Sequence, residues 1–171
     1  MASNLDLQEQ EQVAEFKAWW AKWGNLILSA ATLVLLAIAG FNGWQWYKRS
    51  QAGAAAQVYE QIQQGLQEKD NKKVRDGAAE IMANYGSSGY APLAALVAAK
   101  VNFDAGDLKS ARLQLQWVID NAREPELQSI ARLRLANLLV DEKAYDEAIK
   151  LIGERIEKPF VPMAAALKGD I

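Results

Sequence analysis

Apolar and polar residues are distributed unevenly along the chain, and the longest apolar stretch lies near the N-terminus. Trp23 to Tyr47 are 25 consecutive residues without a formal charge, and Leu26 to Phe41 are almost all apolar. A helix of that composition has no polar face to turn towards water. The 21 steps from Trp23 to Trp44 span about 32 Å, against a hydrocarbon core of about 30 Å. The pattern predicts one transmembrane helix over residues 23–47.

Aromatic residues stand at both ends of this predicted span, where such rings settle at headgroup depth. They are Trp19, Trp20 and Trp23 before it and Trp44, Trp46 and Tyr47 after it. The competing interpretation is a cleaved signal peptide, because Ala37-Ile38-Ala39 resembles a small-residue cleavage site. The upstream residues are more acidic than basic, however, whereas a signal peptide begins with a positive segment. An uncleaved signal anchor is therefore the preferred interpretation.

Residues 1–22 precede the span and hold the net negative charge of the chain. Val13, Phe16, Trp20 and Trp23 recur at helical spacing on one face. That spacing predicts an amphipathic turn or two that lies on the membrane and leads into the span. The alternative is that the same face docks a soluble partner.

Small and polar residues inside the span are candidate contacts for another transmembrane helix. Asn25, Ser29 and Thr32 fall on one helical face, and Ala39 and Gly43 form a pair of small residues four positions apart. Side-chain hydrogen bonds and close backbone approach between membrane helices use such residues. The alternative is that they are ordinary residues of a single span, with Asn25 at the interface.

Everything after Arg49 has the pattern of short helices. No segment alternates apolar and polar residues with the β-branched enrichment typical of strands, and strong helix formers dominate. Glycine, proline and short polar clusters interrupt the pattern. These breaks predict helices that come in pairs, over residues 51–68, 72–84, 90–104, 107–122, 126–141 and 144–157, with a final piece from residue 160.

The helix pairs repeat with a period of 37 residues, which separates Ala111 from Ala148 and Leu96 from Leu133. Three copies of a helix-turn-helix unit are visible, and the turns resemble those of a tetratricopeptide repeat. The first helix departs from that repeat, and the period is longer than its usual 34 residues or so, so a generic α-solenoid is the alternative. The predicted fold class is all-α: a single transmembrane helix followed by a tetratricopeptide-like α-solenoid.

Stacked repeats of this kind leave a curved surface lined by the first helix of each pair. A mixture of aromatic, aliphatic and amide groups there suits a segment of another protein better than a small metabolite. Several of these residues are equally expected in the core. The candidate groove residues are Tyr59, Gln63, Leu96, Lys100, Phe103, Leu133, Asn137 and Val140.

The composition argues against catalysis, because the chain has no cysteine and no histidine. It therefore lacks thiolate metal sites, cysteine nucleophiles, and the commonest general base and metal ligand. Neighbouring acids such as Asp141-Glu142 and Asp146-Glu147 lie at a predicted helix junction, where acids are ordinary capping residues. We expect no enzyme activity, no cofactor, no metal and no small-molecule substrate.

The charge balance of residues 48–171 is neutral, with 17 of the 19 Lys and Arg residues and 17 of the 21 Asp and Glu residues. That region has no basic footprint for nucleic acid, so no nucleic-acid partner is expected. Charge also fails to orient the span, because Lys17 and Lys22 before it balance Lys48 and Arg49 after it.

Five segments of the chain together match a known family. They are EQVAEFKAWWAKWGN (residues 11–25), GWQWY (43–47), YAPLA (90–94), ARLQLQ (111–116) and RLRLA (132–136). These segments resemble the ancillary SecYEG translocon subunit family, the YfgM-like tetratricopeptide proteins of Gram-negative inner membranes. The likeness covers about residues 10–170, and its N-terminal run is the most specific part.

The resemblance implies a type II single-pass protein of the bacterial inner membrane. Residues 1–22 would be cytoplasmic, residues 23–47 a transmembrane signal anchor, and residues 48–171 a periplasmic repeat domain. It also implies association with the SecYEG channel and with the PpiD-like periplasmic chaperone, in assisting newly translocated polypeptides. Family members usually continue through another helix pair, and residues 162–170 resemble the start of that pair.

Two other classes of function remain as alternatives to a membrane-tethered interaction module. The first is an envelope scaffold for outer-membrane assembly or cell division that uses the repeat groove. The missing lipoprotein cysteine and the retained span argue against it. The second is an enzyme, which the missing histidine and cysteine place last.

Overall fold

The computed structural model describes the backbone of residues 3–171 and the side chains of residues 12–169 and 171. The chain forms two compact units, Met1–Tyr47 and Lys48–Ile171. All regular elements of the described residues are helices, which confirms the predicted all-α class.

Helix α1, Ser3–Glu68, contains the predicted span and the first helix of the repeats without a break. No glycine or proline separates them at Lys48, Arg49 and Ser50, and so nothing ends the helix there. Its part from Gln12 to Glu68 is long and apolar enough to cross a membrane. Large apolar side chains such as Leu33 and Leu35 point outward, about two thirds exposed, as lipid-facing side chains do.

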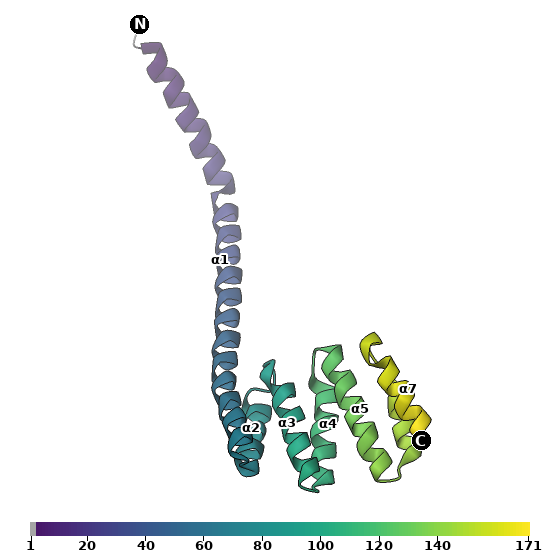
Figure 1. Ribbon diagram of the computed structural model, residues 1–171. Coiled ribbons are helices and arrows are strands. Elements are labelled where there is room, and N and C mark those ends of the chain that lie inside the picture. The colour runs from purple at the N-terminus through teal and green to yellow at the C-terminus, as the bar shows by residue number, and fades with distance from the viewer. Residues whose placement is uncertain (1–2) are drawn as a thin grey trace. The chain divides into compact units, whose positions relative to one another are not determined.

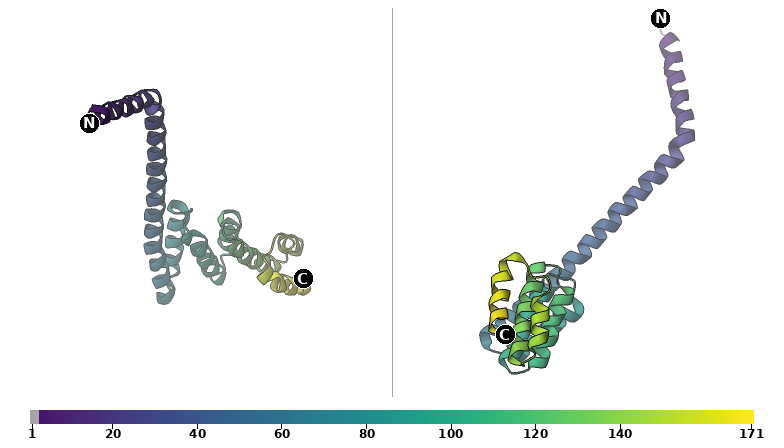
Figure 2. Two further views of the ribbon diagram at one scale, coloured as in Figure 1. Left: turned by 90° about the horizontal axis from the view of Figure 1, so that it is seen from above. Right: turned by 90° about the vertical axis from the view of Figure 1, so that its right-hand side faces the viewer.

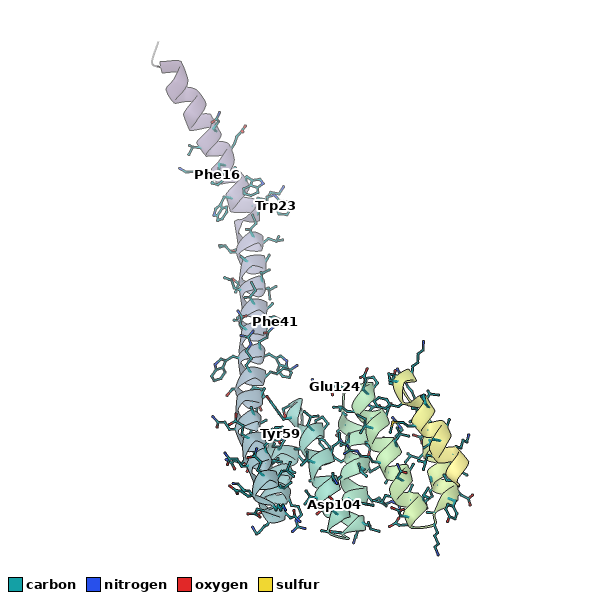
Figure 3. The ribbon with its side chains drawn as sticks, in the orientation of Figure 1. Phe16, Trp23, Phe41, Tyr59, Asp104 and Glu124 are labelled. Carbon is teal, nitrogen blue, oxygen red and sulfur yellow. The ribbon has the colours of Figure 1, made fainter. Side chains whose placement is uncertain are left out.

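Within the first unit, α1 bends near Trp23, which is labelled at the change of direction in Figure 3. Figure 2 shows the same bend from two other sides. The next residue, Gly24, is buried under the indole ring of Trp20, whose atoms lie 3.1 Å from the point where a Cβ would stand. Glycine weakens a helix by about 1 kcal/mol relative to alanine. The bend therefore falls at the weakest helical position between the amphipathic segment and the apolar span.

The second unit is a row of antiparallel helices that pack in chain order (Figure 1). It consists of the C-terminal part of α1 followed by short helices joined by tight turns. These are α2 (Asn71–Asn84), α3 (Tyr90–Asp104), α4 (Leu108–Asn121), α5 (Pro125–Asp141), α6 (Tyr145–Ile152), the 3₁₀ turn η1 (Lys158–Phe160) and α7 (Val161–Asp170). In Figure 3, Asp104 labels the C-terminal end of α3 and Glu124 the residue just before α5.

The turns between paired helices repeat every 37 residues, which confirms the predicted period. Lys69, Gly106 and Lys143 all have positive φ, at 56°, 79° and 63°. The amide after each of them donates to the carbonyl five residues earlier, and all three hydrogen bonds are 2.8 Å long. A left-handed residue closing a helix in this way satisfies the last carbonyls. Three copies of one helix-turn-helix unit are therefore present.

Small residues of the second helix in each pair let it approach the first closely. Ala111 and Ala148 are fully buried, as is the equivalent Val74. Gly77 lies so close to Ile62 that a Cβ would stand 2.8 Å from the isoleucine side chain. Apolar side chains form two core clusters, one in the first repeat and one in the later repeats, and Trp117 packs against both.

The sixth predicted helix, residues 144–157, is shorter in the structure, because α6 ends at Ile152. Gly153 caps it, and its amide donates to the carbonyl of Ile149 at 3.0 Å. The chain then runs to η1, held by the buried hydroxyl of Ser129, which accepts a hydrogen bond from the amide of Glu157 at 3.0 Å. This tether to α5 replaces the last turn and a half expected from the pattern.

Candidate functional site

The first helix of each pair lines one surface of the repeat unit, as the 37-residue period requires. Equivalent positions of α1, α3 and α5 follow one another along it, for example Tyr59, Leu96 and Leu133. Two neighbouring pockets lie on this surface. They are the candidate site.

The first pocket lies between α3 and α5 and has a volume of about 290 Å³. Leu115 of α4 forms part of it together with Leu138 of α5, so the interior is apolar. Phe103, which is 42% exposed, stands at this pocket from the α3 side. The lining residues are Ala99, Lys100, Phe103, Asp104, Leu115, Arg134, Asn137 and Leu138.

The second pocket lies between α1 and α3 and has a volume of about 360 Å³. Its walls are mainly aliphatic, with the ring of Tyr59 packed against Tyr90 at 5.4 Å between centroids. The lining residues are Tyr59, Leu66, Leu93, Leu96, Val97, Lys100, Val101, Asp104 and Arg134.

The two pockets share three charged residues and so form one groove. We call the place where the pockets meet the crossing; its residues are Lys100, Asp104 and Arg134. Lys100 Nζ and Asp104 Oδ2 form an ion pair at 2.8 Å. Arg134 Nη1 donates to the carbonyl oxygen of Leu96 at 3.5 Å and bridges α5 to α3. Since Lys100 and Asp104 neutralise each other, the guanidinium leaves the crossing with one net positive charge.

The predicted groove residues fall into three groups. Tyr59, Lys100, Phe103 and Asn137 line the pockets, and the Asn137 amide donates to the carbonyl of Leu133 at 3.0 Å. Leu96 is 7% exposed and contributes both to the second pocket and to the core. Leu133 is 4% exposed in the core, Val140 packs against that core, and Gln63 is exposed outside both pockets.

Sequence reasoning missed two charged residues of the groove, Asp104 and Arg134. Asp104 stands four residues after Lys100, a spacing that places both on one helical face. Arg134 stands 37 residues after Val97, which lines the second pocket. Extending the repeat register by one position beyond Leu133 would have found it.

The predicted contact residues of the span are exposed on α1. The hydroxyls of Ser29 and Thr32 each donate to the carbonyl four residues earlier, both at 2.8 Å. Their donors are thus satisfied inside the helix, and only their oxygen lone pairs and the Asn25 amide remain for another helix. At Gly43 an added Cβ would meet nothing within 4 Å, so the surface beside Ala39 is open to close approach.

The titration shifts in the repeat unit belong to helix ends and surface pairs. Hydrogen bonds from the side chain and backbone of Ser110 lower the pKa of Asp107, which caps α4. The hydrogen bond to Asp76 raises the pKa of Lys72 at the start of α2. Neither group lines the groove.

In the described part of the chain, no cluster of three His, Cys, Asp or Glu side chains is suited to a metal ion.

Comparison with known proteins places this architecture in a family. A family model described as a tetratricopeptide repeat-like domain matches residues 17–171. A protein of Neisseria gonorrhoeae named ancillary SecYEG translocon subunit is 30% identical over 96% of this chain and 79% of its own length. Proteins of the same name from Haemophilus influenzae and Escherichia coli K12 are 25% and 26% identical, over 96% and 95% of this chain and 80% and 78% of their own lengths. No solved structure matches the chain.

Proposed function

Because the chain belongs to the ancillary SecYEG translocon subunit family with its tetratricopeptide repeat-like domain, we propose that it is a membrane-anchored interaction module of a SecYEG-type channel. The observation that carries this proposal is the two-pocket groove on a stack of helix pairs whose first helix continues from an apolar span. Its task is to assist polypeptides that have just crossed the membrane.

The proposed topology is type II. Residues 1–22 lie in the cytoplasm, residues 23–47 anchor the chain, and residues 48–171 form a periplasmic domain. In this arrangement the groove stands on the side where a translocated polypeptide emerges. A PpiD-like periplasmic chaperone is the proposed second partner, to which such a polypeptide is passed.

The groove suits an extended polypeptide segment. Its two apolar pockets accept two apolar side chains of one segment, since they meet at the shared residues Lys100, Asp104 and Arg134. The net positive charge from Arg134 favours an acidic or polar residue between those two side chains. A polypeptide whose apolar side chains are not yet buried offers such a pattern, and a folded protein does not.

The span supplies the proposed contact with the channel. Ala39 and Gly43 offer a flat patch for close packing against another membrane helix, and Asn25, Ser29 and Thr32 offer hydrogen-bonding atoms. Bulky substitutions at Ala39 and Gly43 would hold a partner helix away without changing the groove.

Site-specific photo-crosslinking in the native membrane tests the role of the groove. A photoreactive residue replaces Phe103 in the groove or, as a matched control, Leu113, an exposed apolar residue of α4 outside both pockets. We expect adducts with newly exported polypeptides from position 103 and far fewer from position 113. Equal yields at the two positions would contradict the assignment of the groove.

A further inference from the structure

The helical segment just before the span carries an apolar face that the repeat groove does not explain. Val13, Phe16, Trp19, Trp20 and Trp23 are each at least 43% exposed. At about 100° per residue they occupy a sector of about 120° of the helix. Three of the rings gather into one cluster, with Phe16 stacked at 6.1 Å on Trp19 and at 6.3 Å on Trp20.

Charged side chains stand outside that sector. Glu15, Lys17 and Lys22 flank it, and Lys22 Nζ lies 5.9 Å from the ring centroid of Trp23. The ammonium group thus lies over the indole ring as in a cation–π contact, and lysines beside tryptophan are typical of helices at a membrane surface. The segment therefore has the two faces of a helix that lies between water and lipid.

The bend near Trp23 separates this segment from the span (Figure 3). Trp20 folds over Gly24, which has no side chain to obstruct it. A bend at this point lets the residues before it run along the membrane surface while the residues after it cross the bilayer.

We propose that residues 12–23 form an interfacial anchor, with the Val13, Phe16 and tryptophan face embedded at the headgroup level of the phospholipid bilayer and Gly24 as its hinge. This inference is independent of the groove and of the channel. The occupant of the face is lipid because the face is continuous with a membrane span and is dominated by tryptophan, the residue that prefers this depth.

Spin labelling tests the anchor directly, because the chain contains no cysteine to compete with an introduced one. The whole chain is reconstituted alone into vesicles of phosphatidylethanolamine and phosphatidylglycerol. A spin label is attached to the cysteine introduced by Val13→Cys or Phe16→Cys on the apolar face. Glu15→Cys and Ala18→Cys, outside that face, are the matched controls. We expect labels at positions 13 and 16 to collide with oxygen more than with a water-soluble nickel chelate. Labels at positions 15 and 18 show the reverse.

Two results would overturn the anchor. The first is nickel access at positions 13 and 16 that equals the access at positions 15 and 18, which means that the face lies in water when no protein partner is present. The second is oxygen access that is high at all four positions, which means that the segment lies deep in the bilayer. A label after Leu33→Cys confirms that the span is inserted in every sample.

The hinge has its own test in Gly24→Leu, whose side chain needs the place that the Trp20 ring occupies, 3.1 Å from the new Cβ. Gly40→Leu is the matched control, because a Cβ there meets nothing within 4 Å. We expect Gly24→Leu to lower the oxygen access at position 16 and Gly40→Leu to leave it unchanged. Unchanged access in both variants would remove Gly24 from the proposal.

Discussion

Replacing Gly106 with alanine isolates the conformational requirement of the repeated turn. Gly106 has φ = 79°, and an added Cβ would meet nothing within 4 Å, so only the backbone conformation opposes the change. The left-handed region costs a residue with a Cβ about 1–2 kcal/mol. Alanine also restricts the unfolded chain, which returns about 0.4–1 kcal/mol. We expect a net loss of about 1 kcal/mol in the free energy of unfolding.

The matched variant is Lys143→Gly at the equivalent turn, where lysine now adopts φ = 63°. The same two terms act there with opposite signs, so we expect a gain of up to about 1 kcal/mol. Lys69, with φ = 56°, should respond in the same way.

Urea denaturation of the full chain in mild detergent, followed by far-ultraviolet circular dichroism, measures both changes. At a slope of about 2 kcal/mol per molar urea, the midpoint moves by about 0.5 M, downward for Gly106→Ala and upward for Lys143→Gly. The micelle protects the span, and so the transition reports the repeat unit. A Gly106→Ala variant whose urea midpoint is not lowered, or a Lys143→Gly variant whose midpoint is lowered, would refute the equivalence of the turns.

Three further predictions concern the tether, a helix cap and the groove. Ser129→Ala removes the acceptor of the part-buried Glu157 amide, so we expect a loss of about 1 kcal/mol and faster proteolysis after α6. An unchanged urea midpoint would contradict the tether. Asp107 has a lowered pKa, so its stabilising contribution is present above its ordinary pKa of 3.8 and is lost as the pH falls through the lower folded value. Asp107→Asn keeps the cap but has no group that titrates, so we expect its urea midpoint to fall less steeply than that of the unsubstituted chain as the pH is lowered. Arg134→Glu reverses the charge of the groove crossing, and we expect binding of a peptide with one acid between two apolar residues to weaken by about three- to tenfold in fluorescence anisotropy. Equal loss for the neutral peptide would contradict the charge argument.

The repeat architecture could be predicted from the sequence because its signals are local. Asp70 and Asp107 cap the helices that follow them, and Gly106 accepts the left-handed conformation that ends α3. The structure places a second left-handed residue at Lys69. The period of 37 residues then relates one turn to the next. Helix α6 ends with Gly153 as its C-cap, but a lone glycine does not fix where a helical pattern stops. The path of the chain after it depends on a hydrogen bond from Glu157 back to Ser129 on another helix.

The groove was less accessible to sequence reasoning than the fold. The repeat register identifies the helix that faces the groove but does not distinguish a lining side chain from a core one. Leu96 and Leu133 occupy equivalent positions, yet Leu96 lines the second pocket and Leu133 lines neither of the two. Arg134 was missed because it sits beside the expected row and enters the groove through its long side chain, which reaches the carbonyl of Leu96.

The bend in α1 illustrates a third limit. The amphipathic spacing from Val13 to Trp23 is visible in the sequence, but a lone glycine in a helical pattern does not reveal whether the helix bends. Here the structure adds the reason, since Trp20 occupies the space over Gly24 that a side chain would have filled.

Affinity purification of the protein from its own membranes in mild detergent, followed by mass spectrometry, shows whether the chain associates with a SecYEG channel. We expect SecYEG channel subunits to be recovered with the unsubstituted chain, and the double variant Ala39→Leu with Gly43→Leu to lower their recovery. Phe103→Ala should leave that recovery unchanged, because it alters the groove and not the span. A purification that recovers the protein in good yield but no channel subunit would contradict the proposed function.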